Sequence, residues 1–210
     1  MQNTSKIKAI VFDWDGVIVD SMPIIAKGIQ ATAASYGVHL SVDDVIAKYI
    51  QPREAFYKSI GIEPENKEEL VTRHSTHISK HFSQPKLFDD VVPTLARLKA
   101  DGIKIGVVSH AKKPRVESEV KALGLQSFFD SENIVGEQRN KAEKLLSIIK
   151  QFGITPAELL FVGDLPSDIT TAKKVGAKSA GISRHESGKA RLKAENPDYF
   201  LDSLLDLLKI

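Results

Sequence analysis

Apolar runs that are typical of buried strands alternate with helical patterns along most of this 210-residue chain. The apolar runs lie at 7–12, 104–108, 159–162 and 178–182, with a weaker one at 133–135. The helical patterns lie at 92–100, 141–152 and 168–175, and each is followed by a glycine: Gly102, Gly153 and Gly176. Strands that alternate with helices predict an α/β fold with a doubly wound parallel sheet.

One region interrupts this alternation. Between residues 22 and 87 we find no convincing strand, and four helices are expected instead, at 22–35, 42–49, 53–59 and 65–82. Ser41 and Asp44 form an S-x-x-D pattern that is typical of a helix start. We therefore expect a core domain at 1–20 and 88–210, and a small all-helical domain at 21–87 inserted between the first and second strands.

Composition narrows the possible function classes. Hydrophobic residues make up 42% of the chain and charged residues 27%, values near the globular average, so a folded protein is expected. The chain has no cysteine, which excludes disulfides, thiolate zinc sites and a cysteine nucleophile. The apolar stretches are too short to span a membrane, and the start MQNTSKIKA has no signal-peptide pattern, so we expect a cytoplasmic protein without a membrane partner. A formal charge of +2 gives no reason to expect nucleic acid and is compatible with a small anionic substrate; a monomer or homodimer is expected.

The first apolar run leads into two carboxylates, Asp13 and Asp15, which flank Trp14 and precede Gly16. In extended backbone, residues two apart face the same side. Two like charges on one side repel each other, so this arrangement favours a cation beside them. Gly16 lacks a Cβ atom and lets the chain turn tightly below a bound group.

Other polar side chains follow the later strands. Ser109 and His110 come after the run at 104–108, Asp164 and Asp168 after the run at 159–162, and Lys141 opens the helix between these strands. Ligands of an open parallel sheet bind at the carboxyl ends of its strands. Carboxylate oxygens suit Mg²⁺, while a hydroxyl and an ammonium can hold phosphoryl oxygens.

The two leading carboxylates also suit a covalent mechanism. Asp13 could bind metal and attack phosphorus to form an aspartyl-phosphate. Asp15 could protonate the leaving oxygen and then activate water. The candidate catalytic set is therefore Asp13, Asp15, Ser109 and Lys141.

In this order the residues resemble the four motifs of the haloacid dehalogenase superfamily, in its phosphatase and phosphomutase branch. The matching segments are Asp13-Trp14-Asp15-Gly16-Val17, Val107-Val108-Ser109, Lys141, and Gly163-Asp164 with Asp168. The insert is similar to the small helical cap of that family. The resemblance implies an Mg²⁺-dependent phosphatase that acts on a small phosphorylated metabolite. It implies a phosphoenzyme at Asp13, Asp15 as acid and base, and Asp13, Asp164 and the Asp15 carbonyl as metal ligands, supported or joined by Asp168.

Asp15 separates this chain from two other branches of the superfamily. Dehalogenases lack an aspartate at this position, and phosphonatases carry an alanine there, although Trp14 resembles the phosphonatase version. The third motif departs from the frequent K-P-x-P pattern, because Lys141 is followed by Ala142 and Glu143. Arg139 and Lys144 therefore stay open as alternatives to Lys141.

Three further features have alternative interpretations. Arg53 could bind a substrate phosphate, as a cap arginine does in sugar-phosphate mutases of the family, or form a salt bridge within the insert. His110 stands where the family commonly has asparagine or a small residue, and it could contact the substrate or simply cover the site. The histidines at 74, 77 and 81 share one helix face, but no acid or cysteine completes a ligand set, which favours a packing or solvated face over a metal site.

Three other functions remain as alternatives to a phosphatase. A phosphomutase of the β-phosphoglucomutase type is the nearest, because Arg53 is compatible with either reaction. A phospho-accepting signalling domain also gathers acids and a lysine on a doubly wound sheet, but the Asp13–Asp15 pair and the helical insert count against it. An inactive binding protein is disfavoured by the intact Asp13, Asp15 and Asp164.

Overall fold

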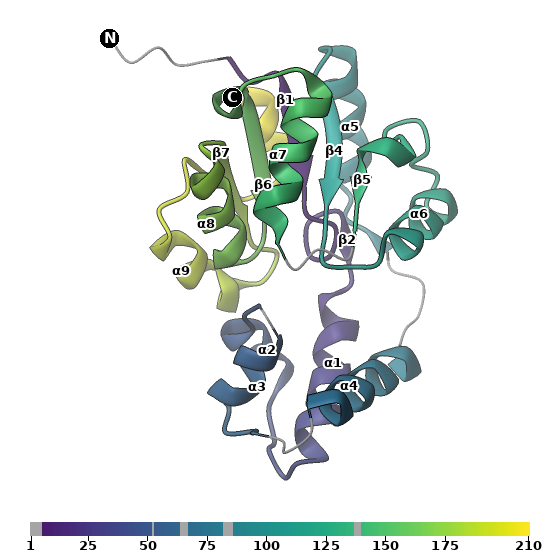
Figure 1. The fold of residues 1–210 in the computed structure, drawn as a ribbon, viewed down its shortest axis with the longest axis vertical. Coiled ribbons are helices and arrows are strands. Elements are labelled where there is room, and N and C mark those ends of the chain that lie inside the picture. The colour runs from purple at the N-terminus through teal and green to yellow at the C-terminus, as the bar shows by residue number, and fades with distance from the viewer. Residues whose placement is uncertain (1–5, 52, 64–66, 82–85, 137–139) are drawn as a thin grey trace.

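The computed structural model describes residues 6–51, 53–63, 67–81, 86–136 and 140–210. Its centre is a six-stranded parallel sheet with the strand order β5-β4-β1-β6-β7-β8 (Figure 1). The strands are β1 (Ala9–Phe12), β4 (Lys104–Val108), β5 (Ile134–Val135), β6 (Leu159–Gly163), β7 (Lys178–Ile182) and β8 (Tyr199–Leu201). The predicted α/β doubly wound sheet is therefore confirmed, with β8 as an additional edge strand.

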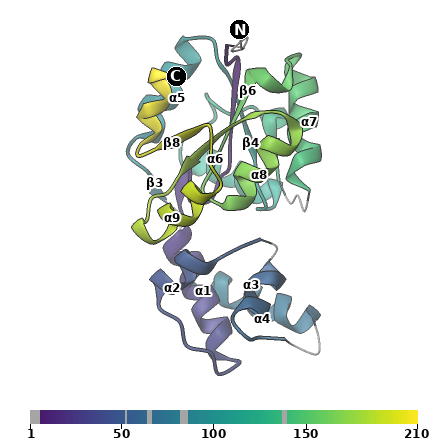
Figure 2. The ribbon, with the colours of Figure 1, turned by 90° about the vertical axis from the view of Figure 1, so that its left-hand side faces the viewer.

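Helices cover both faces of this sheet. One face carries α5 (Val91–Ala100), α6 (Lys113–Ala122) and the short η3 (Leu204–Lys209), and the other carries α7 (Lys141–Phe152) and α8 (Pro166–Val175) (Figures 1 and 2). Successive side chains of β1 point to opposite faces of the sheet, so this strand contributes to the apolar cluster on each face. Ile10 and Phe12 belong to one cluster, and Ala9 and Val11 belong to the other. The remaining core elements are η1 (Ser131–Asn133), η2 (Pro156–Glu158) and α9 (Glu186–Ala194).

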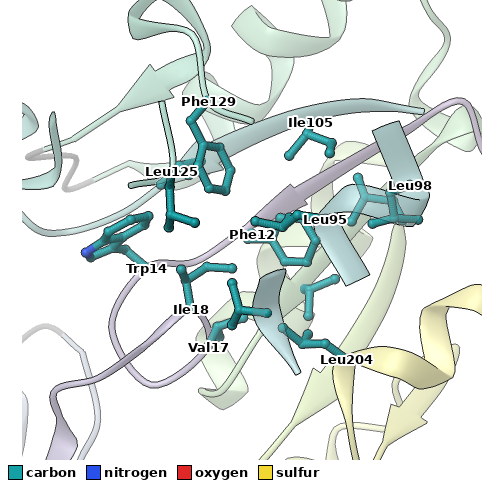
Figure 3. Close-up of a cluster of buried hydrophobic side chains, with 14 of the residues drawn as sticks. Phe12, Trp14, Val17, Ile18, Leu95, Leu98, Ile105, Leu125, Phe129 and Leu204 are labelled. Carbon is teal, nitrogen blue, oxygen red and sulfur yellow. The ribbon is translucent and has the colours of Figure 1, made fainter. Parts of the chain in front are cut away.

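Trp14 belongs to the first of these clusters. Its ring meets Phe129 edge-on, with 5.9 Å between ring centroids. Figure 3 shows the indole nitrogen at the rim of the cluster, directed away from Phe129 and Leu125. Trp14, between the two leading aspartates, is therefore part of the hydrophobic core, and its indole nitrogen lies at the edge of the apolar cluster.

The described part of the inserted segment forms four helices, which lie together beyond one end of the sheet (Figures 1 and 2). They are α1 (Met22–Ala34), α2 (Val42–Lys48), α3 (Arg53–Ser59) and α4 (Lys67–His81). They share an apolar cluster that includes Ile29, Phe56 and Tyr57, and Leu165 from the loop after β6 packs into it. Because Leu165 follows the carboxyl end of β6, the helices sit over that edge of the sheet. Within the described residues, no helix combines the length and apolar character needed to cross a bilayer.

A short antiparallel pair connects the sheet region to the inserted helices. Strand β2 (Val19–Asp20) pairs with β3 (Lys86–Leu87), so the chain leaves and returns side by side. The expectation that no strand lies between 22 and 87 is wrong for β3, because two residues are too few to show strand periodicity. The predicted helix start at Ser41 is confirmed: its hydroxyl accepts from the Asp44 amide, and its own amide donates back to the Asp44 carboxylate.

Candidate active site

Asp13 is the first residue after the central strand β1. Its backbone N–H donates to the Val162 carbonyl of β6 at 2.8 Å, which extends the β1–β6 pairing by one residue. The Trp14 N–H donates to Oδ1 of Asp13 at 2.7 Å and fixes one carboxylate oxygen. The side chain is buried, so the chain places an oriented carboxylate at the carboxyl end of the sheet.

Lys141, the first residue of α7, meets this carboxylate. Its Nζ lies 2.5 Å from Oδ2 of Asp13 and 2.8 Å from Oδ1 of Asp168, and all three residues are buried. Burial opposes the charge on Lys141, but the two carboxylates outweigh it and raise the pKa of the ammonium. Of the alternative cations, Arg139 lies outside the described residues and Lys144 is half-buried. Lys141 is therefore the described lysine that reaches Asp13.

Asp168 has two partners that fix its position. Its Oδ2 accepts a hydrogen bond from the Leu165 N–H at 3.1 Å at the start of α8, while its Oδ1 meets Lys141. An acidic residue in the first turn of a helix is stabilised by the free backbone amides there. Asp168 thus serves both the helix start and the acidic site.

Three carboxylates form a compact cluster at this edge. Asp13, Asp164 and Asp168 each offer one oxygen within 4.8 Å of the others. Among the described residues, Asp164 has no hydrogen bond or ion pair. Burial, followed by the charges of Asp13 and Asp168, raises its pKa well above the ordinary value. Burial also raises the pKa of Asp13, against the opposing charge of Lys141. When all three carboxylates are ionised, one ammonium leaves excess negative charge beside it, and this set of hard oxygen donors fits Mg²⁺.

Position 16 needs a glycine, because the Asp164 carboxylate of this cluster lies very close to its backbone. A Cβ atom built on Gly16 would lie 2.4 Å from Oδ2 of Asp164, and the residue has φ +76°. Both the space and the left-handed backbone exclude a larger residue without rearrangement.

The Asp15 side chain points to different partners from those of Asp13. Its two oxygens meet the Arg115 guanidinium of α6, and Oδ1 also accepts from the Ser21 hydroxyl at 2.5 Å. That the two carboxylates face the same side stays a prediction, since the charges of both Asp13 and Asp15 reach His110. The side chain of Asp15 is not part of the acidic cluster.

Ser109 and His110 follow β4 beside this site. Ser109 is buried, and its Oγ accepts from the Ala111 N–H at 3.1 Å. His110 is half-buried; burial, followed by the charge of Lys141, lowers its pKa to about 4. The imidazole is therefore neutral at physiological pH and lies within the field of both Lys141 and Asp13.

Two residues of the inserted helices lie within electrostatic reach of the core site. The positive charge of Arg53, at the start of α3, acts on His110 and on Tyr49, at the end of α2. Burial raises the pKa of Tyr49, and the charges of Asp15 and Asp164 contribute to this rise. Arg53 and Tyr49 are thus close enough to the sheet edge to interact electrostatically with it.

Tyr49 was not predicted as a site residue. Its hydroxyl accepts from Gln51 Nε2 at 2.6 Å, and its backbone carbonyl accepts from Nη1 of Arg191 in α9. One residue therefore links the inserted helices to the core, and its hydroxyl lies within electrostatic reach of Asp15 and Asp164. This role was not predictable from the sequence, because an aromatic residue at a helix end is usually part of the apolar core.

The histidines on one face of α4 differ in their burial. His74 is buried, its Nδ1 pairs with the Tyr57 hydroxyl at 2.8 Å, and burial lowers its pKa to about 4. This is the packing role that the sequence favoured. His77 is half-buried, and the side chain of His81 lies outside the described residues.

Comparison with known proteins agrees with this arrangement. A family model described as haloacid dehalogenase-like hydrolase matches residues 10–182. A protein of Clostridium perfringens is 31% identical over 97% of both chains. Pyrophosphatase PpaX of Bacillus cereus is 29% identical, covering 98% of this chain and 96% of that protein. A haloacid dehalogenase-like hydrolase structure from Streptococcus pneumoniae has a TM-score of 0.83 at 22% identity, over 97% of both chains. The chain therefore belongs to the haloacid dehalogenase-like hydrolase family.

Proposed function

We propose that this enzyme is an Mg²⁺-dependent phosphatase that hydrolyses a small phosphorylated metabolite through an aspartyl-phosphate on Asp13. The observation that carries the proposal is the surroundings of Asp13. Its carboxylate is buried at the end of the central strand, between the Lys141 ammonium and the carboxylates of Asp164 and Asp168. A buried, oriented carboxylate beside a fixed positive charge suits attack on a phosphoryl group.

Asp13, Asp164, Asp168 and the Asp15 carbonyl are the groups that would hold the metal. When bound, Mg²⁺ would offset the negative charge of the phosphoryl oxygens and so lower their repulsion of the incoming carboxylate. Lys141 would hold Asp13 in place and contribute a second positive charge. Ser109 and the backbone amides after β4 would position the phosphoryl oxygens.

The reaction would proceed in two displacements. A carboxylate oxygen of Asp13 bonds to phosphorus while the bond to the leaving oxygen breaks, and the electron pair goes to that oxygen. Water then bonds to the same phosphorus, the Asp13–phosphorus bond breaks, and the water proton passes to the Asp15 carboxylate. Phosphate is released and Asp13 is regenerated.

We further propose that residues 21–87 form a cap that selects the substrate and excludes water from the site. Tyr49 and Arg53 would contact the part of the substrate beyond the transferred phosphoryl group. Inorganic pyrophosphate is the first substrate to test, because the Bacillus cereus relative bears the name pyrophosphatase. Phosphoglycolate, sugar phosphates and nucleoside monophosphates also fit a site of this kind.

The test is phosphate release from a panel of these compounds, with Mg²⁺ and with EDTA. Wild type is compared with Asp13→Asn, and with Asp130→Asn as a matched control at an exposed acid. We expect Mg²⁺-dependent release that falls at least about 10³-fold in Asp13→Asn and is unchanged in the control. Undiminished turnover by Asp13→Asn would refute the covalent mechanism.

The same assay separates the phosphomutase alternative. If no panel member releases phosphate, the enzyme is incubated with a sugar 1-phosphate and the matching bisphosphate. Interconversion of the 1- and 6-phosphates that depends on Asp13 would identify a mutase. Inactivity in both assays would favour a binding role.

A further inference from the structure

Arg191, on α9, is a half-buried cation at the place where the core meets the inserted helices. Its Nη1 donates a hydrogen bond to the Tyr49 carbonyl at the end of α2, and α9 packs against α2. Figure 2 shows α9 at the end of the core that is next to these helices. The chemistry proposed for Asp13 does not use this guanidinium.

One edge of the Arg191 guanidinium has no acceptor. Among the residues that the structure describes, only Nη1 has a hydrogen-bond partner, whereas Nε is buried without one and Nη2 is left free. A guanidinium binds carboxylate or phosphate through two parallel hydrogen bonds, and the Nε–Nη2 edge can form such a pair. A buried donor of a charged group costs free energy when it has no acceptor. An anionic oxygen at this edge would remove that cost.

Arg191 also lies within electrostatic reach of the acidic cluster. Burial lowers the pKa of the Arg191 guanidinium, and the charge of Asp164 opposes that shift. Burial raises the pKa of Asp164, and the charge of Arg191 is one of those that oppose this rise. Within the described part of the chain the two side chains form no ion pair. They are therefore near enough for their charges to interact but leave room for a small ligand to extend from one to the other.

Two neighbouring groups make the surroundings of Arg191 suitable for an anion. Ser187 lies four residues before it on the same face of α9, and the Ser187 hydroxyl is buried with no hydrogen-bond partner among the described residues. On the side of the inserted helices, the charge of Arg53 opposes the rise that burial causes in the pKa of Tyr49. Tyr49 is thus close to two guanidinium groups, one from each part of the protein.

We propose that Arg191 binds a second anionic group of the substrate, a carboxylate or a phosphate beyond the transferred phosphoryl group, through its Nε and Nη2 atoms. This inference rests on the proposed phosphatase function and makes Arg191 a specificity-determining residue. Because Nη1 holds the Tyr49 carbonyl at the same time, one guanidinium joins the bound anion to both α9 and α2. A substrate without the second anion leaves this edge unpaired and binds less tightly.

The test uses two phosphate esters that differ in one group. Phosphoglycolate ends in a carboxylate, and hydroxyethyl phosphate ends in a neutral hydroxyl. Turnover with Mg²⁺ is measured for wild type, for Arg191→Met, which removes the donors, and for Arg191→Lys, which keeps the charge but not the paired N–H groups. Lys193→Met is the matched control, because it removes a positive charge from an exposed position of the same helix.

In Arg191→Met we expect the ratio of kcat/KM for phosphoglycolate to that for hydroxyethyl phosphate to fall about 10–10²-fold, mainly through KM. This is the scale of one charge-assisted hydrogen-bonded pair. Arg191→Lys should fall between wild type and Arg191→Met, and Lys193→Met should keep the wild-type ratio. If Arg191 serves only to hold the Tyr49 carbonyl, both esters lose activity equally and the ratio does not change.

An unchanged ratio in Arg191→Met would overturn this inference while leaving the phosphatase function standing. Should Arg191→Met not fold, as judged by its thermal transition, Arg191→Lys serves for the same comparison, and an unchanged ratio there would equally count against the inference.

If wild type hydrolyses no compound of the panel, the proposed function fails, and binding tests the anion site separately. Phosphonopropionate and propylphosphonate are analogues that cannot be hydrolysed, with and without the carboxylate. Both are titrated by calorimetry into the protein with Mg²⁺. Arg191→Met should weaken the binding of phosphonopropionate alone. Equal affinities of wild type for the two compounds, or equal losses in the variant, would show that Arg191 binds no second anion.

Discussion

The Nζ atom of Lys141 lies 2.5 Å from Oδ2 of Asp13, and both side chains are almost completely removed from water. The same ammonium lies 2.8 Å from Asp168. One buried cation thus holds two carboxylates in place at the end of β1. Because removing a single member of a buried ion pair leaves its partner uncompensated, this contact links the stability of the fold to the geometry of the proposed nucleophile.

Lys141→Met should destabilise the protein by about 3–5 kcal/mol at neutral pH, measured by urea unfolding in EDTA. The pKa of Lys141 is raised in the fold, so its contribution is present at neutral pH and is lost only as the pH rises through the raised value. Lys174→Met, at an exposed position of α8, is the matched control and should change the free energy of unfolding little. A Lys141→Met protein as stable as the control would show that the buried pair is not needed for the fold.

Asp164→Asn should make the metal-free protein more stable at neutral pH. Its pKa is raised by burial, so the stability linked to its neutral form is present at low pH and is lost as the pH rises through the folded value. An amide of the same shape avoids that loss, and we expect the melting temperature in EDTA to rise by at least about 2 °C.

Mg²⁺ should reverse this order. Ligand binding to the folded state stabilises wild type by mass action, whereas Asp164→Asn lacks one carboxylate of the cluster and should gain little. The measurement is thermal unfolding in EDTA and across an Mg²⁺ titration, with Asp130→Asn as control. An Mg²⁺-dependent shift in Asp164→Asn as large as in wild type would exclude Asp164 as a ligand.

His110→Gln should leave the shape of the pH–rate profile unchanged between about pH 5 and pH 8. Burial and the charge of Lys141 lower the pKa of His110 to about 4, so the imidazole does not titrate in that range. By linkage, any stability that its neutral form contributes is present above the ordinary histidine value and is lost as the pH falls toward 4. A titration near pH 6.5 that disappears in His110→Gln would contradict the buried, neutral state.

Tyr49→Phe should raise KM about tenfold while leaving the melting temperature close to wild type. The aromatic ring, which packs edge-on against Phe56 with 5.3 Å between centroids, is retained, and only the hydroxyl, which lies within electrostatic reach of Asp15 and Asp164, is lost. Tyr36→Phe is the matched control within the inserted helices, because the Tyr36 hydroxyl is buried and has no hydrogen-bond partner among the residues that the structure describes. If both variants have the wild-type KM, the Tyr49 hydroxyl does not contact the substrate.

The set of side chains that meet at the edge of the sheet was largely predictable from their positions in the sequence. Each of Asp13, Ser109 and Asp164 directly follows an apolar run that becomes a parallel strand. Because parallel strands end at the same edge, their positions along the chain were enough to predict that they meet. Lys141 was predicted in the same way, from the helix that leads into β6.

Secondary structure was predictable where elements are long and periodic. The bounds of β4, β7 and α7 agree with the apolar patterns, whereas β2, β3 and β8 are too short to show a period. Helix α9 buries little apolar surface, chiefly Leu192, and so has no marked hydrophobic stripe. The contact that this helix makes with the inserted helices exists only in the folded protein, where Arg191 donates a hydrogen bond to the Tyr49 carbonyl.

The direction of the Asp15 side chain was decided by tertiary structure alone. The sequence placed Asp13 and Asp15 together after the first strand and suggested a shared cation, but in the structure the two carboxylates have different partners: Lys141 for Asp13 and Arg115 for Asp15. Arg115 is 100 residues away along the chain. Local patterning determines which side chains reach the edge of the sheet, while the packing of α6 against the extension of β1 decides which charges they meet there. The first depends on neighbours in sequence, and the second on contacts that exist only after the core has formed.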